Sequence, residues 1–385
     1  MKSSLDSSTP FYTKLAMVLV SIISIVYISI IGKFILSPLL FAFLLAMLLL
    51  PVASFLEKKV KLSRGLASTV AILLLLLIVS IVFFLIGTQI SNLAQDWPEF
   101  QEQFAKSGVN IQRWVRTTFN LNFSEQMSYL NTATDKLKSA STSMIGATVL
   151  SVSSVLLFLV FVLIESFFIL QYRRHLKKFL LSLFSKAHAP VVYDIIEQVQ
   201  NIVRKYILGL MLQVLIVAAL CFAAFSLIGI KYALLLGIIA GLFNIIPYIG
   251  ILTAFIFTMA IAVGSAASAT QIVLAAGSMI GVHLVDSNFL LPVIVGSKVK
   301  INPLITLLGV ILGEMVWGIP GMFLSIPMIA IIKIIFDRID SLQPWGYLLG
   351  EEDAEVPEPA IAENAKEEIL QEAESLKAGE EKPVD

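Results

Sequence analysis

The sequence predicts an all-α, polytopic integral membrane protein with about six full spans and two broken or re-entrant helical hairpins. Three observations lead to this class. The 385 residues are 58% hydrophobic and have a mean hydropathy of +0.90, whereas soluble domains contain about 45–50% apolar residues. Several apolar runs approach or exceed the roughly 20 residues that a helix needs to cross a bilayer. Two further apolar runs are overlong and carry proline and glycine near their middle.

Charge is distributed unevenly along the chain. Lys and Arg together number 27, as do Asp and Glu, so the formal net charge is zero. From Glu351 onward there are 13 acidic and 3 basic residues, a net charge of −10, so the rest of the chain carries +10. Most of those bases lie between apolar runs, which the positive-inside bias explains, and we expect no nucleic-acid partner. A single cysteine, Cys221, excludes a disulfide framework.

Residues 1–88 are predicted to form the N-terminal membrane spans. Apolar runs lie at 15–31, 34–56 and 65–88. No small-x-small cleavage pattern follows the first run, so we interpret it as a retained span rather than a signal peptide. The connector EKKVKLSR, 57–64, contains four bases in eight residues and is predicted to be cytoplasmic.

Residues 89–143 are predicted to form an external helical segment. Five bases are spread over these 55 residues, which also contain Trp97 and Trp114. Apolar residues recur at weak helical spacing, which favours a small helical cap. A plain connector is the alternative.

Residues 144–342 are predicted to form the membrane transport region, with spans at 144–170, 207–228 and 270–295. The segment 171–206 contains seven Lys and Arg residues and is predicted to be cytoplasmic. Within it, 190–206 has apolar residues at helical spacing and one polar face, which predicts an amphipathic interfacial helix. Residues 343–385 are predicted to be an acidic disordered cytoplasmic tail, because this segment has too little apolar surface to bury.

The first overlong run, 231–264, has 34 residues. As one straight helix it would be about 51 Å long, against a hydrocarbon core of about 30 Å. Its middle reads NIIPYIG, 244–250. Pro247 removes a backbone hydrogen bond, Gly250 permits conformations that other residues resist, and Asn244 is expected to bond backbone groups that the break leaves free.

The second overlong run, 301–336, repeats this pattern with WGIPG, which contains Gly318 and Gly321. Unpaired backbone groups are tolerated at membrane depth only inside protein or beside a water-filled cavity. Paired interrupted segments point to a transporter binding site, and proline kinks without function are the alternative. If both runs are hairpins, Lys298 and Lys300 face the cytoplasm. If both are broken single spans, these lysines face outside. The positive-inside rule favours hairpins.

Between the two runs lies HLVDSNFLLP, 283–292, with several polar residues in an apolar context. His283 and Asp286 are three residues apart and share a helix face, and Asn288 follows. An intramembrane charge is costly and indicates function, so Asp286 could bind a cation, carry a proton or hydrogen-bond a polar substrate. A structural carboxyl that pairs with His283 or caps a broken helix is the alternative. Glu314, beside the second break, is a further candidate for lining the same cavity.

Motifs of catalysis are not found in the sequence. It has no phosphate-binding glycine loop, its three histidines lack metal-ligand spacing, and no nucleophile-plus-base pattern stands out. We therefore expect neither an enzyme nor a cofactor nor a metal site.

In these motifs the chain resembles the autoinducer-2 exporter family of bacterial permeases. The resemblance covers roughly residues 10–342 and is carried by NIIPYIG, DSNFLLP at 286–292, INPL at 301–304 and WGIPGMFLSIP at 317–327. Two positions depart from the family pattern: Ile251, where a second proline is frequent, and Leu210, where a polar residue is frequent. The positions that match are Asn244, Pro247, Gly250, Asp286, Asn288, Pro292, Pro303, Gly318, Gly321 and Pro327.

The resemblance implies a secondary transporter that exports a small polar metabolite such as autoinducer-2. It also implies the bacterial inner membrane, with both termini cytoplasmic, and a homo-oligomer, with a pentamer as the expected state. Some family members resemble sodium or lithium/proton antiporters, which gives the alternative function. A passive pore or scaffold is the third possibility. The expected partners are the lipid bilayer and a small polar solute, a monovalent cation or a proton.

Overall fold

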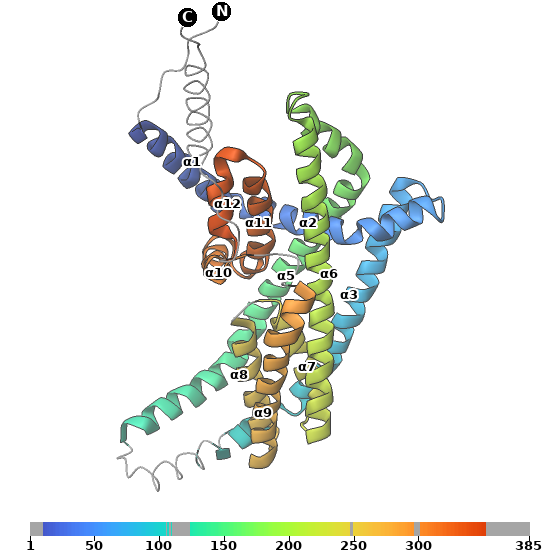
Figure 1. Ribbon diagram of the computed structural model, residues 1–385. Coiled ribbons are helices and arrows are strands. Elements are labelled where there is room, and N and C mark those ends of the chain that lie inside the picture. The colour runs from blue at the N-terminus through green and yellow to red at the C-terminus, as the bar shows by residue number, and fades with distance from the viewer. Residues whose placement is uncertain are drawn as a thin grey trace, which may run out of the picture.

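In a computed structural model of the chain, every described element is a helix (Figure 1), which confirms the all-α class. The structure describes residues 11–104, 106–107, 109, 124–246, 249–295 and 301–351. The helices are α1 (Phe11–Ile31), α2 (Lys33–Lys58), α3 (Arg64–Gln95), α5 (Ser124–Ser182), α6 (Ala189–Ile228), α7 (Ala233–Phe243), α8 (Ile249–Gly264), α9 (Ala269–Val285), the π-helix η1 (Asp286–Val295), α10 (Pro303–Trp317), α11 (Ile319–Asp337), the 3-10 turn η3 (Asp340–Leu342) and α12 (Gln343–Leu349).

Six of the described helices are long and apolar enough to cross a membrane. Five of them contain predicted spans, and the sixth is α11, the second half of an overlong run. The predicted first span forms α1, whose apolar part, Leu15–Ile31, is shorter. The six candidates are Lys33–Lys58, Arg64–Gln95, Ser153–Ser182, Ala189–Ile228, Ala269–Ile294 and Ile319–Asp337.

Three predicted boundaries differ from the structure. The predicted interfacial helix 190–206 is no separate element but the first part of α6, because the chain from 191 to 208 contains neither glycine nor proline to break it. Residues 343–349 of the predicted disordered tail form α12, where Gly346 is buried against Asp337. Of the predicted external segment, 124–143 begin α5. Residues 110–123 and 352–385 lie outside the described residues.

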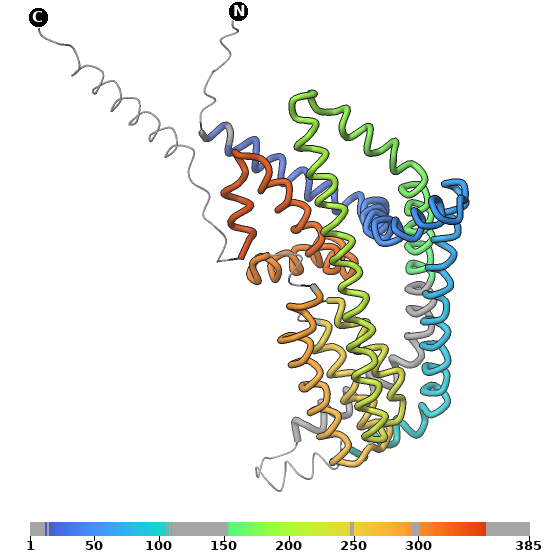
Figure 2. Tube along the Cα trace, turned by 45° about the vertical axis from the view of Figure 1, so that its right-hand side comes forward, coloured from blue at the N-terminus to red at the C-terminus, as the bar shows by residue number. Residues whose placement is uncertain are grey.

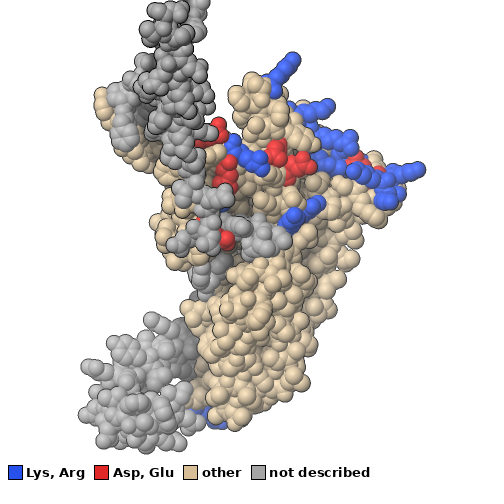
Figure 3. Space-filling model, in the orientation of Figure 1, with Lys and Arg blue, Asp and Glu red and all other residues tan. Residues whose placement is uncertain are grey.

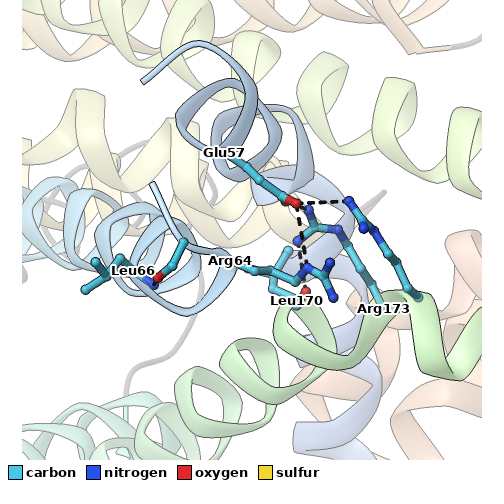
Figure 4. A network of polar contacts seen from close by, with 7 residues as sticks. Glu57, Arg64, Leu66, Leu170 and Arg173 are labelled. Carbon is cyan, nitrogen blue, oxygen red and sulfur yellow. Dashed lines mark hydrogen bonds and ion pairs between the residues drawn. The ribbon is translucent and has the colours of Figure 1, made fainter. Parts of the chain in front are cut away.

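One end of the molecule, here called the basic end, contains the α2–α3 connector and the junction of α5 with α6. Lys and Arg side chains gather there, while the body below is free of charge over most of the face in Figure 3. Glu57, at the end of α2, pairs with Arg173 and with Arg174 of α5 at 3.0 Å, and Arg64 of α3 lies 3.7 Å away (Figure 4). This network joins three helices.

The first overlong run is a helical hairpin. Residues 231–232 and 264–266, its two ends, line one cavity together with residues 96–103. Because both ends lie together, the run returns to the side from which it starts, and it is not a single kinked span. We call this side of the molecule the Asp96 end. The helices α7, α8 and α9 lie alongside the lower half of α6 (Figure 2).

The second overlong run is also a hairpin. A β-carbon at either Gly313 or Gly321 would overlap the other residue's backbone, so α10 and α11 touch closely near their connection at Gly318. At the open end, the backbone N–H of Asn302 donates to the Leu349 carbonyl at 3.0 Å, and α12 packs back onto α11. Arg338, just after α11, pairs with Asp194 of α6 at 2.6 Å. The two hairpins therefore open toward opposite ends of α6.

Helix α6 lies at the centre of the packing. Its second half contributes Val217, Cys221 and Phe225 to a core shared with α7, α8 and α9. Its first half contributes a second core, which includes Leu210 and is joined by Ile245 from the first hairpin connection and Trp317 from the second. Both hairpin tips therefore pack around the middle of α6.

Candidate functional site

A buried polar cluster forms where α6, α7 and η1 meet. Asp286 is 6% exposed and Gln213 is 3% exposed. Gln213 donates its side-chain amide to Asp286 Oδ1 at 2.8 Å, and Asn244 donates its amide to Asp286 Oδ2 at 3.0 Å. A buried carboxylate needs such donors, because its transfer from water is otherwise costly. No described basic side chain forms an ion pair with it.

The local sequence explains how η1 positions Asp286 in the buried polar cluster. α9 begins with a capping box, in which Ser268 and Gln271 exchange backbone and side-chain bonds. It runs as an α-helix to Val285 and continues as a π-helix that contains Pro292, a residue that cannot supply the backbone N–H that α-helical bonding uses. Such π-helical turns are frequently found at functional sites. At Gly209 of α6 a β-carbon would lie 2.7 Å from the Ile294 carbonyl oxygen, so η1 packs directly on the α6 backbone.

Glycines also position Asn244 in the buried polar cluster. On α7, β-carbons at Gly237 and Gly241 would lie 2.8 and 2.6 Å from carbonyl oxygens of α6. The two glycines are four residues apart and form a close helix–helix contact of the kind that membrane helices favour. At Gly250 a β-carbon would overlap the Phe243 carbonyl oxygen, so the α7–α8 connection requires glycine there.

The remaining predicted site residues lie apart from the cluster. Asn288 is exposed and donates to the Leu284 carbonyl, and His283 has a buried Nδ1 without a partner rather than a bond to Asp286. Glu314 is exposed, and its backbone carbonyl accepts a hydrogen bond from the Gly318 N–H. Gly318, with φ +69°, and Gly321 shape the second hairpin. Pro247 lies outside the described residues.

Gln213 is the member of this cluster that sequence reasoning missed. Its only signal is a neutral amide in an otherwise apolar run. Its amide nitrogen is used by Asp286, but its buried Oε1 has no partner. The cluster thus presents a carboxyl group without a basic partner among the described side chains and an unmatched acceptor, which suits a hydroxyl-bearing or cationic solute. Among the described residues, no group of three or more His, Cys, Asp or Glu side chains could hold a metal ion.

A second polar region lies at the Asp96 end, around a cavity of about 290 Å³. Asp96 pairs with Lys231 at 2.6 Å and accepts a hydrogen bond from the Tyr232 hydroxyl. The hydrogen bond from Lys231, followed by that from the Tyr232 hydroxyl, holds the pKa of Asp96 below its usual value. The hydrogen bond to Asp96 raises the pKa of Lys231. Phe100 packs onto Gly264, where a β-carbon would overlap the ring. These contacts join the end of α3 to both ends of the first hairpin.

Comparisons with a family profile and with individual proteins agree that the chain resembles transport proteins. A profile of the family described as AI-2E family transporter matches residues 15–341. The protein YueF of Bacillus subtilis, named as a candidate transport protein, is 27% identical over 315 residues, which cover 78% of this chain and 83% of YueF. YhhT of Escherichia coli, similarly named, is 22% identical over 314 residues, which cover 81% of this chain and 87% of YhhT. PerM of Escherichia coli, named as a candidate permease, is 25% identical over 133 residues, which cover 34% of this chain and 38% of PerM.

Proposed function

The chain belongs to the AI-2E family of transporters, and on this premise we propose that it is a secondary transporter whose solute passes the Gln213–Asp286–Asn244 cluster. The family and the long apolar helices indicate a membrane transport role. A family of transporters is consistent with the expectation that the chain is not an enzyme. The observation that carries the proposal is the buried carboxylate held by two neutral amides, each from a different helix.

The first candidate solute is a small polar metabolite such as autoinducer-2, moved outward. A hydroxyl-rich molecule supports this choice chemically, because its hydroxyls can donate to Gln213 Oε1 and to Asp286 and can accept from amides. The family's description supports the same solute class. Net export follows if the solute is produced inside the cell and the pathway opens in turn to either side.

A sodium or lithium/proton antiporter is the second candidate. The observation that favours it is that Asp286 has no basic partner among the described side chains, so a cation or a proton must balance its charge at membrane depth. Its carboxylate and the free Gln213 oxygen are hard oxygen ligands. A passive pore or scaffold would need neither group.

We place the protein in the bacterial inner membrane with both termini cytoplasmic. The support is the positive-inside bias, because Lys and Arg gather at the basic end. The apolar side chains exposed along α1, α3 and α5 fit lipid or further copies of the chain, in keeping with a homo-oligomer, for which we propose a pentamer.

The test is flux across proteoliposomes that contain the purified protein. Autoinducer-2 release is measured in one set, and sodium- or lithium-dependent pH change in another. We expect Asp286→Asn to assemble normally and lose at least tenfold of whichever flux the wild type supports, and Asp286→Glu to retain part of it. The matched control is Asp340→Asn, because Asp340 is exposed in η3. Unchanged flux in Asp286→Asn would remove the cluster from the pathway.

A further inference from the structure

One buried hydroxyl in the first hairpin has no hydrogen-bond partner. Thr258 of α8 is 0% exposed, and its Oγ1 bonds neither a neighbour nor its own helix among the described residues. By contrast, Thr69 and Ser29 donate to the carbonyl four residues earlier. An unsatisfied buried polar group costs about 1–3 kcal/mol. Ser37 of α2 and Ser68 of α3 share this property, but Thr258 differs in its position.

Thr258 faces the interior of the bundle that α6, α7, α8 and α9 form. Ala254 and Ala262, four residues to either side, are also 0% exposed and belong to the core that these helices share. On α9, Ala275 and Met279 belong to the same core. Asp286 follows Met279 by seven residues, which places it on the same helix face. The stripe around Thr258 therefore faces an interior whose far end holds Asp286.

The other end of this stripe reaches the cavity at the Asp96 end. Ser265 follows Thr258 by seven residues and lines that cavity. Along α8 the separation is roughly 10 Å, and from Thr258 back to Gly250, beside the Asn244 connection, it is roughly 12 Å. Thr258 thus lies midway between two polar regions, and its neighbours on the same buried face, Ala254 and Ala262, are apolar.

The two arms of the hairpin differ in how they are held. α7 lies against the α6 backbone through Gly237 and Gly241. On α8 the described glycine contacts lie only at its ends, at Gly250 and Gly264. Both arms meet the rest of the chain at a non-glycine residue with positive φ, Tyr232 before α7 (φ +65°) and Ala266 after α8 (φ +58°), and such strained residues gather at switch regions. α7 is in addition held by its glycines against the α6 backbone, whereas the described glycines of α8 make no such contact with α6, so α8 is the less tightly held arm.

We propose that Thr258 is an intermediate contact of the solute pathway, between the Asp286 cluster and the cavity at the Asp96 end, and that movement of α8 exposes it to the solute. A hydroxyl both donates and accepts, so it can replace one bond that a polar solute gives up on leaving Asp286. This inference rests on the proposed function.

The first experiment compares Thr258→Val with Thr258→Ser in the autoinducer-2 and cation flux assays. Valine keeps the branched shape and removes the unsatisfied hydroxyl, so the melting temperature should be equal or higher. We expect flux to fall at least fivefold in Thr258→Val and to stay within twofold in Thr258→Ser. The matched control is Thr253→Val, because Thr253 lies on the same helix and is only partly buried. Normal flux in Thr258→Val would overturn the inference.

The second experiment tests exposure directly. Thr258→Cys in a Cys221→Ala background is treated in proteoliposomes with a small cationic methanethiosulfonate reagent, whose charge is compatible with the Asp286 cluster. A core residue that never meets water stays unmodified, whereas a pathway residue reacts, and faster when solute is added. Ser265→Cys, at the cavity, is the positive control. Complete protection of position 258 while position 265 reacts overturns the inference.

The two proposals fail in distinguishable ways. If the wild type moves neither autoinducer-2 nor sodium nor lithium, the proposed function fails, and modification at position 258 still decides whether the interior beside α8 opens to water. If the wild type transports but Thr258→Val is normal and position 258 is protected, only the inference about Thr258 fails.

Discussion

At the scale of single residues, Gln213 shows how the cluster is both stabilised and left open. One end of its amide holds Asp286, and the other end is buried without a partner. Polar groups in cores are nearly always paired. The unpaired oxygen is therefore a place that a ligand can fill, and the amide nitrogen is a structural requirement of the buried carboxylate.

We expect Gln213→Leu to weaken both stability and transport. The substitution leaves Asp286 with Asn244 as its remaining side-chain donor among the described residues, and a lost partner for a buried polar group costs about 1–3 kcal/mol. The measurements are the thermal midpoint in detergent and the vesicle flux. Gln198→Leu is the control, since Gln198 also lies on α6 but bonds Asp194 at the basic end. Wild-type values for Gln213→Leu would contradict this reading.

Sequence reasoning predicted Asp286 because a charge in an apolar run is conspicuous. It predicted that Asn244 would satisfy free backbone groups, whereas the amide in fact reaches a carboxylate 42 residues away. It grouped Glu314 with a shared cavity, but that side chain is exposed. Local pattern indicates which residue types are costly in lipid, but it does not give the tertiary neighbour that makes the cost tolerable.

At the scale of the elements, the first hairpin depends on the absence of one side chain. We expect Gly250→Ala to lower stability by about 1–3 kcal/mol, the usual cost of an overpacked site, because its β-carbon would overlap the Phe243 carbonyl oxygen. Gly277→Ala is the matched control, since nothing lies within 4 Å of its β-carbon and alanine favours helix. Thermal unfolding in detergent measures both, and equal midpoints for the two variants would contradict the tight connection.

The contact of Asp96 with Lys231 and Tyr232 should be insensitive to pH over a wide range. The lowered pKa of Asp96 means that its stabilisation is present above the ordinary aspartate pKa and is lost as pH falls through the lowered value. The raised pKa of Lys231 means that its part is present below the ordinary lysine pKa and is lost as pH rises through the raised value. The contact is therefore complete between about pH 4 and pH 10.

The corresponding variant is Asp96→Asn. We expect its melting temperature to lie below that of the wild type by a constant amount within this window, and the difference to close in stronger acid. Glu99, which lines the same cavity, supplies the control Glu99→Gln. A difference that varies steeply near pH 7 would show that another group controls the contact.

The hairpins could be predicted from run length, since predominantly apolar runs of 34 and 36 residues exceed what one span needs. The bounds of α5 and α6 could not. Hydropathy marks only the apolar part of each helix, whereas α5 runs from Ser124 to Ser182 and α6 from Ala189 to Ile228. Polar residues with good helix propensity, such as Arg, Lys, Glu and Gln, continue the end of α5 and the start of α6 beyond the apolar part. The start of α5 is rich in Ser and Thr, so propensity did not indicate it.

At the scale of the whole molecule, the two hairpins open toward opposite ends, which fixes an expected topology. In a Cys221→Ala background, we expect Ser265→Cys to react with a membrane-impermeant thiol reagent in intact cells and Lys298→Cys to be protected. Ser265 lies at the Asp96 end, and Asn302, shortly after Lys298, lies at the end where α12 packs. Labelling at position 298 from outside would contradict the proposed orientation.

The short arms of the first hairpin also determine the order in which the chain can be built during synthesis. α7 has 11 residues, about 16 Å, which is too short for the insertion machinery to release into lipid as a span of its own. Its glycine face fits α6, which the ribosome has already made. Once both arms have left the ribosome, the hairpin therefore meets a docking surface that is already in place, whereas a pause that exposes α7 alone leaves a half-made hairpin without its second arm.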